Sequence, residues 1–510
     1  RLYVTFCRVN SDGKALRRSY LIGTLLKLFP QLAVEEPSEE ETLEGALTAE
    51  SALPFLMEGL TKPVEDEEAW TALLAWYLSD EGEREKVMQL FDAAFGAHKD
   101  DAISNAVTKA LYGNTLENSV TRLEQFAACA FAHYLSYGLR LKERELQQFA
   151  SVDMGNIYHT ALERYSRKLE QSEYDWFVVP DAVRRQMAEN AMQEAIAGYP
   201  GMAVCDTAEN AYQRKRMLAI FDQTVWALTR QVRAGQFVPE KFEVTFDELE
   251  GKESLEYRLS HDVTMRLEGR IDRLDTFEDE NKISIKVIDY KSGNTKFDLI
   301  RVYRGLQLQL VVYMDAAMEM LRGQHPKKEI LPGGILYYHI DDPVLESDTP
   351  LSDEEAEQAL LFALRPDGLV NSGEEIYRAM DQNFEGKSQM IPVEIKKNGE
   401  ISAARSKVAS TEEFAVITRY VEHEIRQCGE AIYAGNIAVN PYRSDIETSC
   451  TYCPYGSVCG MDAKIPGYEY RQFASMKKEE VLDQMQTELA RNRGKEERSD
   501  GMDEGTAERH

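Results

Sequence analysis

Residues 237–291 hold, in succession, four segments with the alternation or the short β-branched runs that are typical of β-strands. These segments are 237–248, 255–261, 263–277 and 283–291. A long helix is expected before them at 207–234, and a helix at 304–322 and a strand at 333–340 are expected after them. This order predicts a mixed α/β fold with a central sheet flanked by helices, not a doubly wound parallel sheet.

The last of the four strands ends in "VIDYKSG", residues 287–293. Side chains two residues apart point to the same face of a strand. Asp289 and Lys291 are therefore expected side by side, with Val287 as buried support beneath them. A carboxylate and an ammonium so placed form either a salt bridge or half of an active site.

The stretch "EGRIDRLD", residues 268–275, lies on the strand expected to pair with it. Asp272 and Asp275 are three residues apart, so on a regular strand they face opposite sides and only one can share the space of Asp289. We predict Asp272, with Asp275 as the main competitor. Two carboxylates suit Mg²⁺, which lowers the pKa of an attacking water, and a lysine can stabilise the developing charge.

Two helices add candidate residues. His159 stands in "GNIYHTALE", on a helix expected over 154–171 that starts at a Gly-Asn turn. Gln309 and Tyr313 are four residues apart and share one helical face. A lone helical histidine is more often structural, and a Gln/Tyr pair is unremarkable alone. The whole set is far more specific than any of its members.

Seven cysteines do not suggest a disulfide framework, because the number is odd and three lie close together in Cys450-x2-Cys453-x5-Cys459. Three close thiolates require a fourth ligand for a zinc or [4Fe–4S] site. Cys428 and Cys129 are the two possible fourth ligands. Such a site indicates a reducing compartment.

The formal net charge is −29, from 59 Lys+Arg and 88 Asp+Glu. This balance argues against a surface that binds nucleic acid all over, but it allows a local basic groove. No apolar run reaches membrane-spanning length, so no membrane association is expected. The sequence further predicts an acidic linker and helical region at 34–118 and an acidic, irregular insertion at 341–410. A C-terminal extension, 466–510, is expected to be disordered from about residue 485.

The ordered motifs G-x-x-x-H, G-R-I-D, I-D-Y-K-S-G and Q-x-x-x-Y resemble the RecB-type branch of the PD-(D/E)XK nuclease superfamily. The resemblance implies a metal-dependent DNA nuclease. By matching position it makes His159, Asp272, Asp289 and the Tyr290 carbonyl the Mg²⁺ ligands and Lys291 the catalytic lysine. Gln309 and Tyr313 would lie beside the site and position DNA or the lysine. Glu243, in "PEKFEVTF", stands where relatives often have an acidic residue.

The cysteines are similar to those of AddB-type subunits of bacterial helicase–nucleases. That resemblance implies a [4Fe–4S] cluster on Cys129, Cys450, Cys453 and Cys459, which closes a nuclease domain at 119–465. A proline usually follows the first cysteine, where this chain has Ala130. Residues 1–33 resemble the end of a helicase-like domain, so the chain is expected to be the C-terminal part of a longer protein.

The family implies an Mg²⁺-dependent exonuclease subunit that processes double-strand DNA ends for recombinational repair. It would cut single-stranded ends or tails beside an AddA-type helicase–nuclease subunit in the bacterial cytoplasm. One rival is a separate RecB-like iron–sulfur exonuclease. The other is a nuclease-inactive scaffold that binds DNA ends, which would normally have lost Lys291 or a ligand.

Overall fold

A computed structural model of the chain forms two compact units, Arg1–Ala97 and His98–His510. The residues that it describes are 4–8, 14–34, 48–61, 63–64, 66–95, 102–142, 151–199, 208–248, 255–259, 263–347, 349–445 and 447–503. Among these residues, no helix combines the length and the apolar character needed to cross a membrane. The second unit begins before the nuclease domain that the sequence predicts at 119.

The first unit is helical. Its helices are α1 (Tyr20–Leu28), α2 (Ala49–Thr61), α3 (Glu67–Ser79) and α4 (Glu81–Phe95). Ala52, Leu56, Tyr77 and Val87 form a small buried core between α2, α3 and α4. The acidic stretch expected as a linker therefore contains a helix, α2, which contributes two apolar side chains to that core.

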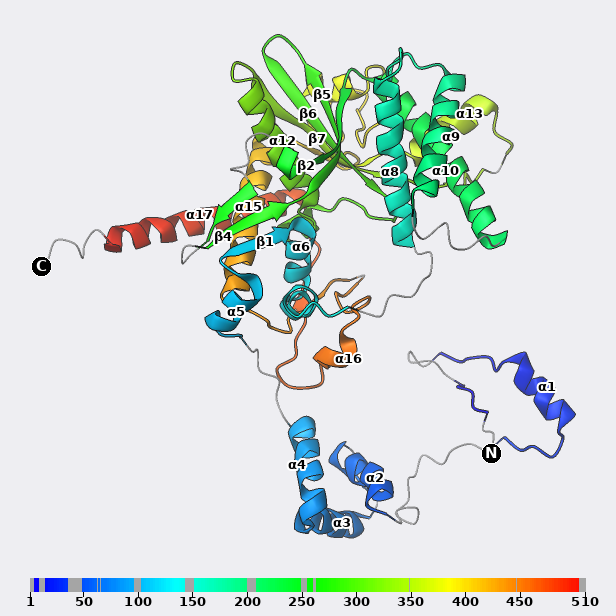
Figure 1. Ribbon diagram of the computed structural model, residues 1–510, viewed down its shortest axis with the longest axis vertical. Coiled ribbons are helices and arrows are strands. Elements are labelled where there is room, and N and C mark those ends of the chain that lie inside the picture. Colours follow the sequence, from blue (N-terminus) through cyan, green and yellow to red (C-terminus); the bar gives the residue numbers. More distant parts are fainter. Residues whose placement is uncertain are drawn as a thin grey trace, which may run out of the picture. The chain divides into compact units, whose positions relative to one another are not determined.

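A six-stranded sheet forms the centre of the second unit, in the order β2-β5-β6-β7-β8-β9 (Figure 1). Its strands are β2 (Val238–Thr245), β5 (Arg270–Glu278), β6 (Lys282–Lys291), β7 (Glu329–His339), β8 (Asp367–Asn371) and β9 (Val408–Ala409). The β6–β7 and β8–β9 pairs are parallel and the other pairs are antiparallel. The mixed α/β prediction is confirmed.

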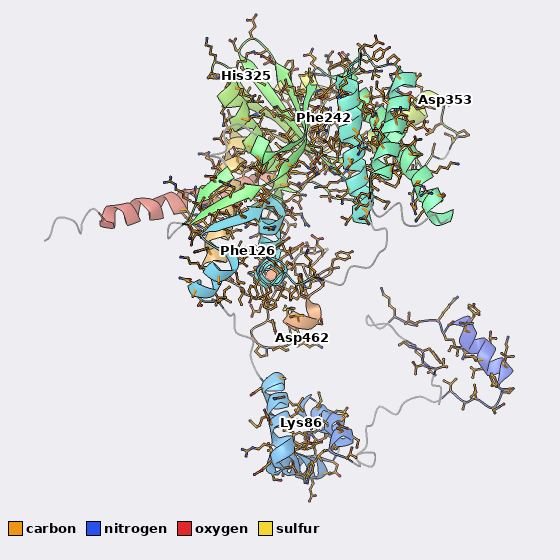
Figure 2. All side chains as sticks on the ribbon, in the orientation of Figure 1. Lys86, Phe126, Phe242, His325, Asp353 and Asp462 are labelled. Atoms are coloured by element: carbon orange, nitrogen blue, oxygen red, sulfur yellow. The ribbon has the colours of Figure 1, made fainter. Side chains whose placement is uncertain are left out.

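The two faces of this sheet bury separate cores. Along β6, Ile283, Ile285 and Val287 belong to one core, whereas Ile288 and Tyr290 belong to the other. Helices α6 (Val120–Ala128), α12 (Gln309–Gln324), α15 (Thr411–Tyr433) and α17 (Lys478–Asp503) supply the first core, and α8 (Ser151–Glu170), α9 (Asp181–Ala197), α10 (Ala208–Ala234) and α14 (Glu374–Met380) supply the second. Figure 2 labels Phe126 of the first core and Phe242, which packs against the second.

Two of the predicted strands lie outside the central sheet. β3 (Glu256–Arg258) and β4 (Thr264–Glu268) form a three-stranded sheet with β1 (Thr115–Ser119). The strand expected over 263–277 is interrupted at Gly269, where a Cβ would lie 2.6 Å from the Phe246 ring. β4 and β5 meet at this close approach, so the second predicted strand and the first part of the third lie outside the central sheet in which they were expected.

The insertion at 341–410 is more regular than expected, because β8 and β9 extend the central sheet and α13 (Asp353–Ala363) precedes them. The helix expected from 304 starts at Gln309, after the short α11 (Leu299–Tyr303). The remaining elements are α5 (Asn105–Tyr112), α7 (Ala130–His133), a π-helical turn (Tyr134–Gly138), a 3₁₀ turn (Phe246–Glu248), β10 (Tyr442–Arg443), α16 (Gly456–Cys459) and β11 (Arg471–Gln472).

In the segment expected to be disordered from about residue 485, the structure has helix α17, which ends at Asp503. Val481, Leu482 and Met485 are buried in the first core, so apolar contacts hold the start of this helix. Glu488 accepts hydrogen bonds from the hydroxyls of Tyr303 (2.6 Å) and Tyr420 (3.1 Å), which fix its next turn.

Candidate active site

Asp272 and Asp289 lie at neighbouring positions of β5 and β6. The antiparallel register pairs Arg273 with Ile288, so Asp272 and Asp289 form the next facing pair and share one face of the sheet. Asp272 Oδ2 accepts a hydrogen bond of 2.8 Å from the Tyr290 N–H. Burial, with the nearby Asp272 carboxylate adding to its effect, raises the pKa of Asp289 to about 7. Two buried carboxylates in this arrangement favour a bound cation.

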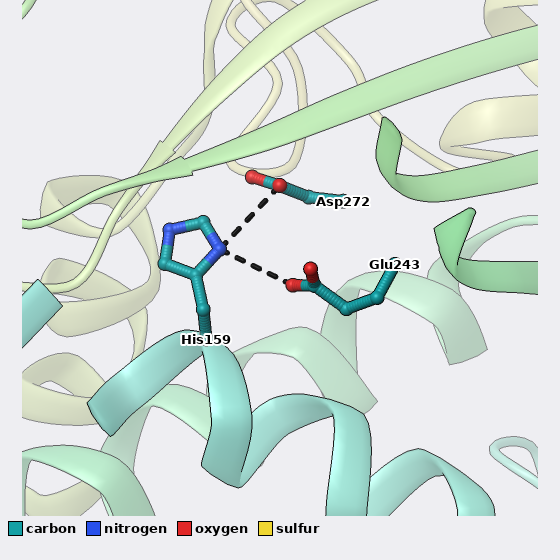
Figure 3. A group of neighbouring side chains, drawn as sticks. All are labelled: His159, Glu243 and Asp272. Atoms are coloured by element: carbon teal, nitrogen blue, oxygen red, sulfur yellow. Dashed lines mark hydrogen bonds and ion pairs between the residues drawn. The ribbon is translucent and has the colours of Figure 1, made fainter. Parts of the chain in front are cut away.

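His159 reaches the same place from α8 (Figure 3). Its Nδ1 lies 3.2 Å from Glu243 Oε1 and 3.4 Å from Asp272 Oδ1, and its Nε2 lies 3.0 Å from the Tyr290 carbonyl oxygen. Burial alone would lower the pKa of His159, but the two carboxylates raise it to about 10. The structure thus brings His159, Asp272 and the Tyr290 carbonyl together.

Gly155 and Asn156, which were expected to start the histidine's helix, lie inside α8 instead. The glycine serves a close approach: a Cβ at this position would lie 3.0 Å from Ser292 Oγ. Ser292 directly follows Lys291, so Gly155 allows α8 to approach the end of β6. The Gly-Asn pair therefore marks a helix–loop contact and not a helix start.

Glu243 is part of this group through an unusual backbone conformation. Residues 242 and 244 pair with 273 and 271, so Glu243 lies opposite Asp272. Its φ of 51° is in the left-handed region, which costs a non-glycine residue on the order of 1–3 kcal/mol and is common at functional sites. Arg270 Nε lies 2.7 Å from its second carboxylate oxygen. The sequence signal for Glu243 was weak, because strand alternation does not show which residue adopts a positive φ.

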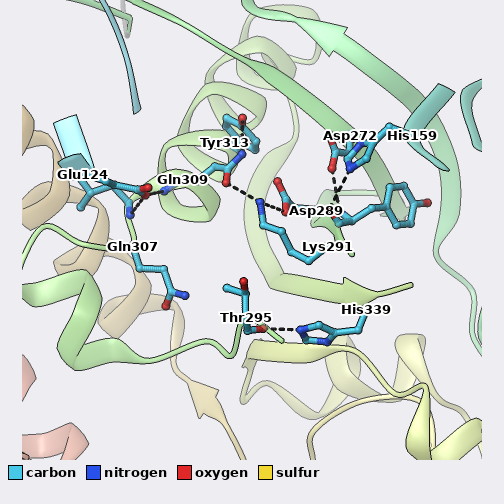
Figure 4. A network of polar contacts seen from close by, with 12 residues as sticks. Glu124, His159, Asp272, Asp289, Lys291, Thr295, Gln307, Gln309, Tyr313 and His339 are labelled. Carbon is cyan, nitrogen blue, oxygen red and sulfur yellow. Dashed lines mark hydrogen bonds and ion pairs between the residues drawn. The ribbon is translucent and has the colours of Figure 1, made fainter. Parts of the chain in front are cut away.

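Lys291 is held by a chain of side chains (Figure 4). Its Nζ lies 2.7 Å from Asp289 Oδ2 and donates a hydrogen bond of 3.0 Å to Gln309 Oε1. Gln309 Nε2 in turn donates a hydrogen bond of 2.8 Å to the Tyr313 hydroxyl. The expected pairing of Asp289 with Lys291 on one face is confirmed, and Val287 is fully buried on that face. Sequence reasoning did not identify Glu124, which contacts the backbone of Gln309, and its only signal was a glutamate in an apolar-faced helix.

Asp275 lies on the opposite face of β5 and does not join this group. Its carboxylate lies 2.6 Å from Arg273 Nε and 2.9 Å from Lys286 Nζ. Burial alone would raise the pKa of Asp275, but Arg273 and Lys286 hold it below its usual range. Asp275 is therefore a buried ion-pair partner.

The donor set suits a hard divalent cation. Among the residues that the structure describes, His159, Glu243 and Asp272 form the one group of three whose ligand atoms lie within 4.8 Å of one another. Ligands on opposite sides of Mg²⁺ lie about 4.2 Å apart, and the ion prefers oxygen ligands. Two carboxylates, with Asp289 and the Tyr290 carbonyl beside them, fit this preference.

The four cysteines expected to act together line one pocket, with apolar neighbours that include Val439 and Met461. Burial raises the pKa of Cys450, and the nearby thiols of Cys129, Cys453 and Cys459 raise it further. Cys428 does not line the pocket, and burial raises its pKa to about 12, so it is a poor source of thiolate. Four tetrahedral zinc thiolates would lie about 3.8 Å apart. In the described part of the chain no three cysteine sulfurs lie within 4.8 Å of one another.

Comparison with known proteins gives two findings. Residues 117–460 match the PD-(D/E)XK nuclease superfamily. The chain is also 35% identical over 517 residues to the B subunit of the ATP-dependent helicase/deoxyribonuclease of Lachnoclostridium phytofermentans, covering 99% of this chain and 43% of that protein. The proteins of the same name from Thermoanaerobacter sp. (strain X514) and Clostridium botulinum (strain Hall) are each 31% identical over 496 residues, covering 96% of this chain and 43% of their own length. The chain thus spans less than half the length of these relatives.

Proposed function

The chain belongs to the PD-(D/E)XK nuclease superfamily, and on that premise we propose that its site hydrolyses phosphodiester bonds of DNA with Mg²⁺. The observation that carries the proposal is the convergence of Asp272, Asp289 and Lys291 on one face of β5 and β6, with His159 beside them. These groups supply cation ligands and a fixed ammonium within one site.

His159, Asp272, Asp289 and the Tyr290 carbonyl would hold the ion, with Glu243 as a further ligand beside His159. Bound Mg²⁺ would polarise the phosphoryl oxygen and lower the pKa of the attacking water. The Lys291 ammonium is positioned to stabilise negative charge that develops on the phosphoryl group. Gln309 and Tyr313 orient that ammonium through the hydrogen bonds described above.

The cysteine pocket would hold a [4Fe–4S] cluster on Cys129, Cys450, Cys453 and Cys459. Four thiols that line one pocket support a bound metal group, and the match of the cysteines to the AddB-type pattern favours an iron–sulfur cluster. The cluster would be structural, because it joins the start of the nuclease domain to its end.

We further infer from the named relatives that the chain serves as the nuclease-bearing part of a helicase–nuclease complex. It would cut single-stranded DNA ends or tails beside an AddA-type partner in the bacterial cytoplasm, during recombinational repair of double-strand breaks. The relatives are named as one subunit of an enzyme, which supports a partner chain, and the word "deoxyribonuclease" in their name supports DNA as the substrate.

The test is degradation of end-labelled single-stranded DNA by wild-type protein and Lys291→Ala, with and without Mg²⁺. We expect Mg²⁺-dependent cleavage by the wild type and a loss of about 100-fold or more in Lys291→Ala, because the charge in the transition state loses a fixed ammonium. Lys282→Ala, at the other end of β6 with a side chain 43% exposed, is the matched control and should cleave normally. Equal cleavage by wild type and Lys291→Ala would refute the mechanism.

A further inference from the structure

The start of α12 receives its cap from another helix. The N-cap residue of α12, Leu308, makes no side-chain capping bond. Glu124 of α6 replaces it: its Oε1 accepts hydrogen bonds from the N–H groups of Leu308 (2.7 Å) and Gln309 (3.2 Å). An oxygen acceptor at this place satisfies two N–H groups that have no partner within the helix.

The capped residue is also the residue that holds the lysine. The backbone N–H of Gln309 donates to Glu124, and its side-chain Oε1 accepts a hydrogen bond of 3.0 Å from Lys291 Nζ (Figure 4). Glu124 therefore lies two contacts from the ammonium. Shifts of about 1 Å in positioned groups can cost about 100-fold in rate, so the anchoring of this backbone matters for catalysis.

We propose that Glu124 is a positioning residue for DNA cleavage, which fixes the Lys291 ammonium by anchoring the backbone of Gln309; this inference rests on the nuclease function proposed above. Its effect works through hydrogen-bond acceptance and does not need the negative charge. Burial raises the pKa of Glu124 to about 7, so the site accommodates a neutral side chain at little cost. A glutamine of the same length can accept both N–H bonds, whereas an aspartate is one methylene too short.

Kinetics on single-stranded DNA at saturating Mg²⁺ tests this role. We expect Glu124→Ala to lower kcat about tenfold or more and to leave KM within about twofold, because the proposed effect of Glu124 is on the position of a catalytic group and not on substrate binding. Glu124→Gln should restore kcat to within about threefold of the wild type, whereas Glu124→Asp should resemble the alanine variant. Arg122→Ala, on the same helix, removes a hydrogen bond to the Glu117 carbonyl and should leave kcat unchanged.

A double-mutant cycle identifies the path of the effect. Gln309→Ala alone should lower kcat. Adding Glu124→Ala should lower it no further, because the hydrogen bond between the Gln309 side chain and Lys291, through which Glu124 acts, is already gone. Losses that multiply in the double variant would overturn the proposal. So would wild-type kcat in Glu124→Ala, or a glutamine variant as slow as the alanine variant. If Glu124→Ala does not fold, the aspartate and glutamine variants provide the same comparison.

The result for Lys291→Ala separates this inference from the nuclease proposal. If Lys291→Ala cleaves DNA as well as the wild type, the proposed nuclease mechanism fails. If Lys291→Ala is inactive but Glu124→Ala keeps the wild-type kcat, only the positioning role of Glu124 fails.

Discussion

Asp272 and Asp275 lie three residues apart on β5 and face different surroundings. Asp272 faces a second carboxylate, Asp289, and burial together with the Asp272 charge raises the pKa of Asp289 to about 7. Asp275 is fully buried between Arg273 and Lys286, which neutralise it. Under the proposed function Asp272 would serve the reaction, whereas Asp275 neutralises buried cationic groups and serves the stability of the fold.

Asparagine at each position should separate the two roles. We expect Asp272→Asn to abolish Mg²⁺-dependent cleavage and to lower the melting temperature by less than Asp275→Asn does, because the ion pair with His159 is lost but the repulsion of Asp289 is relieved as well. Asp275→Asn should destabilise the fold by about 3–5 kcal/mol, because Arg273 and Lys286 then remain buried without their counter-charge. Thermal unfolding and nuclease assays of both variants check this, and an Asp275→Asn variant with wild-type stability would contradict it.

At the scale of elements, α12 and α15 meet through carboxyl groups. Burial, with the nearby Glu422 and Glu319 adding to it, raises the pKa of Asp315 to about 7. Asp315 lies on α12 and Glu422 on α15, where the pKa of Glu422 is also raised, chiefly by burial. The folded protein thus keeps a proton at Asp315 that the unfolded chain releases at about pH 4.

This proton links stability to pH. Between about pH 4 and pH 7 the folded state binds more protons at Asp315 than the unfolded state, so rising pH favours unfolding, and the stabilisation is lost above about pH 7. We expect Asp315→Asn to melt a few degrees higher than the wild type at pH 8. Its melting temperature should also fall less steeply than that of the wild type between pH 5 and pH 8. Asp483→Asn, an exposed position on α17, is the control and should follow the wild-type curve. If the melting temperatures of Asp315→Asn and the wild type changed in parallel with pH, this linkage would be ruled out.

Element types were more predictable than element partners. The pattern of β6 gave its buried face and the pairing of Asp289 with Lys291, because period-two alternation depends on local sequence. The same kind of pattern at 255–261 and 263–268 could not show that β3 and β4 pair with β1, since strand alternation does not specify the partner strand. β8 was missed because five residues inside an acidic segment give too little signal.

At the scale of the whole molecule, the motifs predicted which candidate site residues lie together better than the sequence predicted where the folded segments begin and end. His159, Asp272, Asp289 and Lys291 come from three elements, and the order of the motifs was enough to group them. Glu243 reaches the site through a left-handed backbone and Glu124 through a contact between distant helices, and no local sequence pattern shows either feature. The C-terminal helix was missed because its few apolar residues are concentrated at its start.

The cysteine pocket joins the two ends of the nuclease domain, since Cys129 follows α6 and the other three cysteines lie near the C-terminal end of the match to the family. A cluster on these residues closes a loop of about 320 residues, which in the chain-entropy model stabilises the folded state by about 6 kcal/mol. Removing one ligand should therefore release both the cluster and this restraint.

We expect Cys453→Ser to lose iron and sulfide together and to lower the melting temperature by about 5 °C or more. Cys7→Ser, which changes an exposed cysteine in the first unit, should keep the full cluster and the wild-type melting temperature. Iron and sulfide analysis, visible absorbance and thermal unfolding measure these effects on anaerobically purified protein. Full iron and sulfide content in Cys453→Ser would remove this cysteine from the ligand set. Iron loss without a fall in melting temperature would show that the cluster does not restrain the fold.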